Sequence, residues 1–233
     1  QGKKANLDGD GPAVQMSIMR EQQARSRTTT WPLKSSISSC WMLYQHGKGH
    51  GGGCLHLRVP RRYGRLNFRK AFKDAGFYLS GCCIWKKNAL VLGRSPYQWQ
   101  HEPCLYGWKQ KGKHQWYSDR KQTTIWEYDR PKSNKDHPTM KPIGLMSYPI
   151  RNSTMTNGIV LDPFLGSGST LIACEETDRV CRGIELDPKF VDVIVKRYIE
   201  HSEGHYDDVY VIRDGQKLKF EEVATFEPES EDA

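Results

Sequence analysis

Apolar positions become periodic only from about residue 65 onward. Between Leu66 and Phe77 they recur at roughly helical spacing, and the stretch 78–85 that follows is apolar and rich in β-formers, which predicts a helix and then a strand. Residues 1–64 show little periodicity and carry a glycine-rich patch at 47–53. We therefore expect 1–64 to be an aberrant, poorly ordered segment, so that the amino-terminal strands of the fold are missing or disordered.

The carboxyl-terminal half carries a regular succession of patterns. They predict a short amphipathic segment at 143–150, a buried strand at 158–161, a glycine-bearing turn at 162–168, a helix at 169–177, a strand at 180–186 and a helix at 188–201. Asp187 is suited to cap the last helix, with Pro188 in its first turn. This succession is typical of parallel strands joined by crossover helices, so we predict an α/β fold with a doubly wound, mostly parallel sheet. The acidic segment 227–233 is expected to fray.

Composition excludes several classes of protein. The 233 residues suffice for one domain with a sizeable core, and no run approaches the ~18 apolar residues that a membrane helix needs. The seven cysteines include an adjacent pair but no C-x-x-C spacing, and no secretory signal opens the sequence. We expect a cytoplasmic protein of a reducing compartment, with no metal site and no membrane association.

Charge is unevenly distributed. Residues 1–150 carry 26 Lys and Arg against 9 Asp and Glu, whereas 151–233 carry 9 against 18. The basic part is therefore the candidate surface for a polyanion. Within it, residues 88–136 interleave aromatic side chains with lysine, arginine and glutamine, a mixture suited to phosphates, base edges and exposed bases. A long, partly ordered loop anchored by a few tryptophans explains the same composition equally well.

The turn DPFLGSGST, residues 162–170, is the most informative chemical motif. Gly166 and Gly168 allow the chain to turn tightly from strand into helix and expose bare backbone to a ligand. Glu185 ends the next predicted strand, where its carboxylate can accept hydrogen bonds from both hydroxyls of a ribose. No lysine follows the second glycine, as in a phosphate-binding loop, and Leu171 replaces the third glycine of a dinucleotide turn. A ribose acceptor without a phosphate clamp indicates S-adenosylmethionine, and a purely structural strand–helix turn is the alternative.

Three segments resemble the cofactor-binding part of amino-DNA methyltransferases. They are HPTMKP (137–142), VLDPFLGSGSTLIACE (160–175) and RGIELDPKFVDVIVKRY (182–198); the segments 66–77 and 92–116 resemble the same family. The position of the glycine turn near the carboxyl end resembles the permuted, β-class order of motifs. The resemblance covers about 65–200 and implies a Rossmann-like S-adenosylmethionine-dependent methyltransferase domain at 65–233, with a target-recognition segment at about 88–136. It also implies double-stranded DNA as substrate and methylation of an exocyclic amino nitrogen.

The resemblance carries over to individual residues. The expected cofactor-binding residues are Asp162, Pro163, Phe164, Gly166, Ser167, Gly168, Ser169, Thr170, Glu185 and Lys141. Phe164 is expected along the cofactor, whereas Ser167, Ser169 and Thr170 either contact its amino-acid end or cap the following helix. Lys141, with His137 nearby, either pairs with the cofactor carboxylate or is a surface charge.

The family's catalytic motif, Asp/Ser/Asn-Pro-Pro-Tyr/Phe/Trp, is not found. It accepts hydrogen bonds from the target amino group, and its aromatic residue stacks on the flipped base. The printed sequence contains no Pro-Pro, and its nearest string is Asp10-Gly11-Pro12, so the catalytic residues are unassigned.

A frameshift is one hypothesis for this absence. In shifted frames, residues 10–15 can encode TDPPY, 27–43 can encode NDDMATEEFYQFLLDA and 54–64 can encode AYIFAFRADT. An aspartate in the first position of that motif favours adenine N6 as the target. Cytosine-N4 methylation, a catalytically dead cofactor- or DNA-binding remnant, and an RNA or protein methyltransferase are the alternatives.

Overall fold

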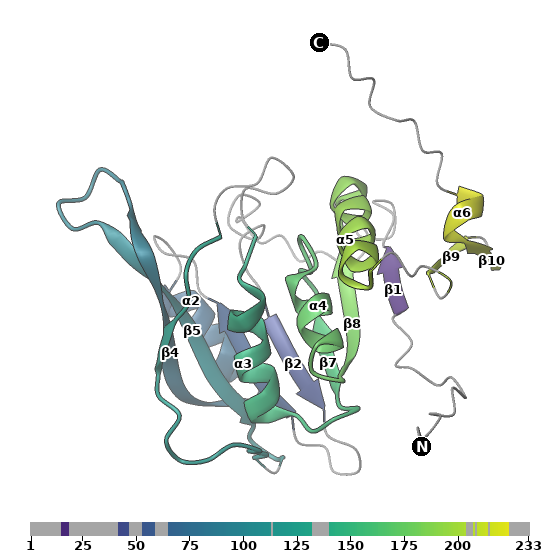
Figure 1. Cartoon of the computed structure of the whole chain (residues 1–233). Coiled ribbons are helices and arrows are strands. Elements are labelled where there is room, and N and C mark those ends of the chain that lie inside the picture. The colour runs from purple at the N-terminus through teal and green to yellow at the C-terminus, as the bar shows by residue number, and fades with distance from the viewer. Residues whose placement is uncertain are drawn as a thin grey trace, which may run out of the picture.

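The computed structural model describes residues 15–18, 42–46, 53–58, 65–112, 114–131, 140–203, 207, 209–213 and 215–223 (Figure 1). Its main sheet has the strand order β1-β8-β7-β2-β3-β5-β4-β6. The strands of this sheet are β1 (Gln15–Ile18), β2 (Met42–His46), β3 (Gly53–Arg58), β4 (Phe77–Val91), β5 (Trp99–Lys109), β6 (Ile125–Glu127), β7 (Ile159–Asp162) and β8 (Val180–Glu185). Near the carboxyl end, β9 (Tyr210–Arg213) and β10 (Gln216–Lys219) form a separate antiparallel pair, followed by the short helix α6 (Phe220–Val223).

Strand directions correct the prediction of a mostly parallel sheet. Strands β1, β8 and β7 run parallel, as do β4 and β6, whereas β2 is antiparallel to both of its neighbours. Strand β5 is antiparallel to β3 and β4. The sheet is therefore mixed: parallel around the predicted turn and antiparallel across its other half.

The amino-terminal part also departs from prediction, because 15–18, 42–46 and 53–58 supply three strands of the sheet. Strand β3 shows why its pattern was missed. Cys54, Leu55 and His56 are all buried, so the strand is covered on both faces, and the histidine interrupts its apolar run. The predicted Asp10-Gly11-Pro12 string and the acidic end at 227–233 lie outside the described residues, as does most of the segment 27–43.

The three predicted helices are confirmed with small shifts of boundary, and the predicted amphipathic segment at 143–150 is also helical. The helices are α2 (Arg65–Asp74), α3 (Ile143–Ser153), α4 (Ser169–Glu175) and α5 (Pro188–His201). Asp187 caps α5 as predicted, because its side chain accepts a 3.0 Å hydrogen bond from the Lys189 amide while Pro188 opens the helix. No helix among the described residues is long and apolar enough to cross a membrane.

Helices lie on both faces of the sheet (Figure 1). The larger core joins α3, α4 and α5 to one face through residues such as Leu145, Val160 and Ile194. The smaller core joins α2 to the other face, where Phe72 packs with Leu55 and Leu105. Alternation along β5 assigns Cys104 to the larger core and Leu105 to the smaller one, as the period of a strand requires.

Strands β4 and β5 form a long hairpin, hereafter the hairpin, whose connection at residues 92–98 is called the hairpin tip. Register followed from β7 through β2 and β3 to β5 places this tip at the same edge of the sheet as the carboxyl ends of β7 and β8. In Figure 1 the hairpin extends to the upper left, away from α4 and α5. The turn after β7 and the hairpin tip therefore face the same side of the molecule.

Candidate functional site

The turn between β7 and α4, residues 162–168, is called the glycine turn. Gly166 has φ 59° and Gly168 has φ 79°, the left-handed region in which glycine carries no steric penalty. A Cβ at position 168 would lie 3.1 Å from Ile194 Cγ2 of α5, so glycine also permits close helix packing there. At Gly166 the nearest atom to such a Cβ is 3.9 Å away, so only the backbone conformation requires glycine.

The Asp162 carboxylate holds the turn from inside. Its side chain is 1% exposed, and its two oxygens accept hydrogen bonds from the Phe164 amide at 3.0 Å and the Thr170 hydroxyl at 2.6 Å. Burial raises the pKa of Asp162 to about 6, against the lowering effect of these two bonds, and the nearby charge of Glu185 adds to the rise. The predicted residues Asp162 and Thr170 thus bind each other beneath the surface of the turn.

Glu185 ends β8 beside this turn, as predicted. Its Oε2 accepts a 2.7 Å hydrogen bond from the Gly166 amide, and its Oε1 accepts bonds from the amides of Leu186 and Asp187 at 2.9 and 3.0 Å. The side chain is half-buried, so its carboxylate remains accessible at the edge of the sheet. The structure therefore brings together Gly166 and Glu185, which are 19 residues apart in the sequence.

Neighbouring elements tether the rest of the turn. The Ser169 hydroxyl donates a 2.8 Å hydrogen bond to the Lys141 carbonyl, just before α3. From α5, the Arg197 guanidinium donates to the Ser167 carbonyl. The Leu165 amide donates a 3.0 Å bond to the carbonyl of Ile184 on β8, and its side chain covers Gly183 so closely that a Cβ there would lie 2.5 Å from Leu165 Cδ2.

Sequence reasoning missed the contributions of Arg197 and Gly183. Arg197 lies three residues after Ile194, and residues at this spacing share one face of a helix. The available signal was therefore a basic residue on the helix face that also carries Ile194, the residue that packs against Gly168.

The predicted site residues divide into two groups by exposure. Asp162, Ser167, Gly168, Ser169 and Thr170 are buried and shape the turn. The accessible group comprises Lys141, Pro163, Phe164, Gly166 and Glu185. Phe164 is 37% exposed, so its ring is available to a ligand on the turn. The residues exposed to solvent at the turn are therefore those of the second group.

Lys141 lies where the turn meets the hairpin. Its ammonium nitrogen is 5.6 Å from the centroid of the Trp85 ring, close enough for a cation–π interaction. Its backbone carbonyl meanwhile receives the Ser169 hydroxyl. His137, weighed with it in the sequence, lies outside the described residues.

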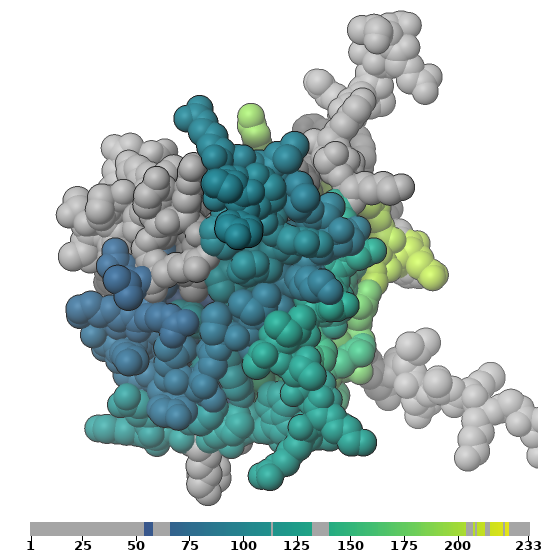
Figure 2. Space-filling model, turned by 90° about the vertical axis from the view of Figure 1, so that its left-hand side faces the viewer, coloured from purple at the N-terminus to yellow at the C-terminus, as the bar shows by residue number. Residues whose placement is uncertain are grey.

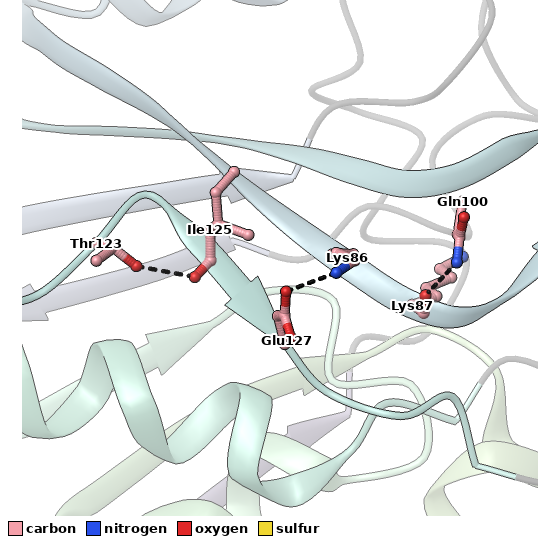
Figure 3. Close-up of polar contacts among 6 residues, drawn as sticks. All are labelled: Lys86, Lys87, Gln100, Thr123, Ile125 and Glu127. Carbon is pink, nitrogen blue, oxygen red and sulfur yellow. Dashed lines mark hydrogen bonds and ion pairs between the residues drawn. The ribbon is translucent and has the colours of Figure 1, made fainter.

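A buried ion pair joins the two strands of the hairpin a few residues below its tip. The Lys87 ammonium of β4 donates to the Glu102 carboxylate of β5, and both side chains are almost fully buried. The same ammonium lies 4.8 Å from the centroid of the Trp85 ring. The side-chain nitrogen of Gln100 donates a 3.0 Å hydrogen bond to the Lys87 carbonyl, which is drawn in Figure 3. The β4–β5 ladder becomes irregular at this point. The Lys86–Glu127 pair beside it, at 2.7 Å, is solvent-exposed.

Aromatic residues of the segment 88–136 do not form one surface. Trp126 is buried in the larger core, as the alternative interpretation expected of an anchoring tryptophan. His114 stacks on Trp108, with centroids 4.0 Å apart, and faces Trp116 at 6.3 Å. This stack adjoins the carboxyl end of β5, which the register places at the edge opposite the glycine turn. The hairpin tip lies instead at the edge that carries the glycine turn.

Comparison with known proteins decides the family. A family model described as DNA methylase, of the N6/N4 type, matches residues 26–196. The chain belongs to this DNA methylase family. The type II methyltransferase M2.MboI of Moraxella bovis is 41% identical over 86 residues, which are 35% of this chain and 32% of that protein. M.Cfr9I of Citrobacter freundii, also a type II methyltransferase, is 31% identical over 150 residues, 57% of this chain and 48% of that protein.

A solved relative supports the fold. The crystal structure of the M1.HpyAVI–SAM complex matches this DNA methylase with a TM-score of 0.54 and 29% sequence identity, covering 62% of this chain and 74% of that one. The chain spans about a third to a half of the length of the two curated relatives named above. Across the described residues, no group of three or more His, Cys, Asp or Glu side chains is arranged to hold a metal ion.

Proposed function

We propose that this DNA methylase binds S-adenosylmethionine on the glycine turn and methylates the exocyclic N6 of adenine in duplex DNA. The observation that carries the cofactor half is the pairing of a left-handed glycine turn with a carboxylate at the end of the next parallel strand. S-adenosylmethionine, when bound, supplies an electrophilic methyl group. The structural relative M1.HpyAVI was crystallised in complex with the same cofactor.

The accessible residues of the turn have distinct roles in this proposal. Glu185 accepts the ribose hydroxyls, because a carboxylate offers about four lone-pair positions and the three backbone amides do not use all of them. Phe164 covers the cofactor from the exposed side of the turn. Asp162 and Arg197 act indirectly, by fixing the backbone on which the cofactor rests.

The DNA half rests on the family and on charge. Residues 1–150, which include the hairpin, carry the excess of lysine and arginine, as a phosphate-binding surface requires. The choice of adenine rests on the aspartate of the TDPPY string that residues 10–15 can encode in a shifted frame. No catalytic residue is assigned in the printed sequence.

Calorimetric titration of the full chain with S-adenosylmethionine tests the cofactor site. We expect Glu185→Ala to weaken binding about 10- to 100-fold, because removing the carboxylate costs ~1–3 kcal/mol of hydrogen bonding. Glu176→Ala is the matched control, since Glu176 is an exposed carboxylate at the end of α4. Equal affinity in the wild type and the Glu185 variant would refute the proposed ribose contact.

Methyl transfer is tested on two genes, the present one and one in which the reading frame upstream of Leu66 is restored. Incorporation of labelled methyl groups into duplex DNA, followed by digestion to nucleosides, identifies the modified base. N6-methyladenine from the restored gene supports the proposal, whereas N4-methylcytosine supports the cytosine alternative. If the proteins from both genes bind the cofactor but transfer no methyl group, the catalytically dead alternative is supported. Transfer to RNA or protein in preference to DNA supports the alternative of an RNA or protein methyltransferase.

A further inference from the structure

The hairpin tip displays large apolar side chains to solvent. Tyr97 is 89% exposed and Leu92 is 83% exposed, and within the described residues no large hydrophobic side chain is more exposed than Tyr97. Leu90, at the end of β4, is also more than half exposed. Single exposed apolar residues are ordinary on protein surfaces, but here they gather on one short connection.

The tip is held in shape by its own hydrogen bonds. The Gln98 side-chain oxygen accepts from the Gly93 amide at 2.7 Å, and its side-chain nitrogen donates to the Ser95 carbonyl at 2.6 Å. Below the tip, the buried Lys87–Glu102 pair fixes the two strands to each other. Apolar side chains on a tied loop of this kind remain presented to a partner at a low entropic cost.

Position and charge indicate which partner the tip fits. It lies at the edge of the sheet that carries the glycine turn, and in Figure 2 the hairpin reaches the upper margin of the face shown. Residues 88–101 contain Arg94 but no Asp or Glu, and Arg94 is exposed on the tip itself. An exposed arginine without a nearby acid in the sequence suits a phosphate backbone, while the apolar side chains of the tip suit the interior of a base stack.

We propose that the hairpin tip is a wedge that enters the base stack of duplex DNA beside the nucleotide to be methylated, with Leu92 and Tyr97 filling the space that this nucleotide leaves. The inference rests on the proposed function, since an enzyme acting on a base in duplex DNA must take that base out of the stack. Unstacking costs a few kcal/mol per step, and apolar side chains inserted between bases offset part of that cost. Arg94 contacts a phosphate next to the insertion.

The test compares two duplexes that differ by one missing base. Binding of the full chain is measured by fluorescence anisotropy on an intact duplex and on the same duplex with one abasic site. We expect the wild type to prefer the abasic duplex about tenfold or more, because the wedge fills a vacancy that is already open. Leu92→Ala combined with Tyr97→Ala is expected to abolish this preference.

Two controls separate the wedge from general effects. Leu66→Ala removes a leucine that is also 83% exposed but lies on α2, and the preference for the abasic duplex should persist. Arg94→Ala should weaken binding to both duplexes alike and reduce the slope of log affinity against log salt by about one. The double tip variant should leave that slope unchanged.

Each outcome bears on a different claim. Unchanged preference in the double tip variant overturns the wedge while leaving the proposed function intact. If the wild type binds S-adenosylmethionine but neither duplex, DNA recognition and the wedge fail together. If instead the tip variant loses self-association in sedimentation and keeps its DNA preference, the tip is a contact between two copies of the chain and the wedge is overturned.

Discussion

The glycine turn and the hairpin tip lie at the same edge of the sheet but expose different kinds of side chain. In the turn, polar side chains such as Asp162 and Thr170 are buried and bind each other, and a small accessible group remains for a ligand. In the hairpin, an ion pair is buried between the two strands just below the tip, and apolar side chains are exposed at the tip. The proposed functions fit this difference, because a cofactor rests on a fixed backbone whereas insertion into a base stack needs exposed apolar atoms.

The buried pair Lys87–Glu102 of the hairpin provides the largest expected effect. Glu102→Ala leaves the Lys87 ammonium buried without this carboxylate, and we expect a loss of about 3–5 kcal/mol in the free energy of unfolding, measured by urea denaturation. The double variant Lys87→Met/Glu102→Leu should recover most of this loss, because it removes both charges. Lys86→Ala, which removes the exposed pair with Glu127, should cost no more than about 1 kcal/mol. Equal losses in the single and double variants would show that the pair is not the cause.

The second prediction concerns Asp162 and the dependence of the protein's stability on pH. Because its folded pKa of about 6 lies above the ordinary value of 3.8, its contribution to stability is present below about pH 4 and is lost as the pH rises through 6. The ionised carboxylate then costs about 2–3 kcal/mol. Asp162→Asn keeps an acceptor for the Phe164 amide and removes the charge. Its stability relative to the wild type should rise by about that amount between pH 4 and pH 7; parallel urea-midpoint profiles for the two proteins would contradict this.

The smallest expected effect is a loss of stability when a side chain is added at Gly183, which packs beneath the turn. Gly183→Ala places a Cβ 2.5 Å from Leu165 Cδ2, and we expect a loss of about 1–3 kcal/mol from overpacking, measured by thermal unfolding. Gly81→Ala on β4 is the matched control, because its Cβ would meet nothing within 4 Å. A Gly183 variant as stable as the Gly81 variant would show that Leu165 moves away at little cost.

Local chemistry made one half of the fold predictable. The glycines of the turn, the cap at Asp187 and the proline after it each constrain the backbone within a few residues, so the elements from β7 to α5 could be placed from sequence. The direction of β2 could not, because side-chain alternation is the same in a parallel and an antiparallel strand. Strand β1 has only four residues, too few for its alternation to predict a strand, and β3 lacks alternation because Cys54, Leu55 and His56 are all buried.

The residues at the centre of the site could be predicted from the sequence, whereas the residues that hold them in place could not. Asp162, Gly166 and Glu185 stand close to each other in the structure because β7 and β8 are sequential parallel neighbours. Arg197 and the Lys87–Glu102 pair depend on packing between elements, and in β4 the irregular ladder after Lys86 hides the register that brings Lys87 to Glu102. Long-range partners of this kind leave no spacing signal in one sequence.

The pairing of β1 with β8 has a consequence for biosynthesis. The hairpin joins neighbouring stretches of chain, so it can close as soon as both strands have left the ribosome, whereas β1 is made first and must wait for β8 near the other end. During that interval the hydrogen-bonding groups of β1 are open to other chains. Slow translation between β1 and β8 should therefore increase aggregation, and a chaperone that shields extended segments should relieve it.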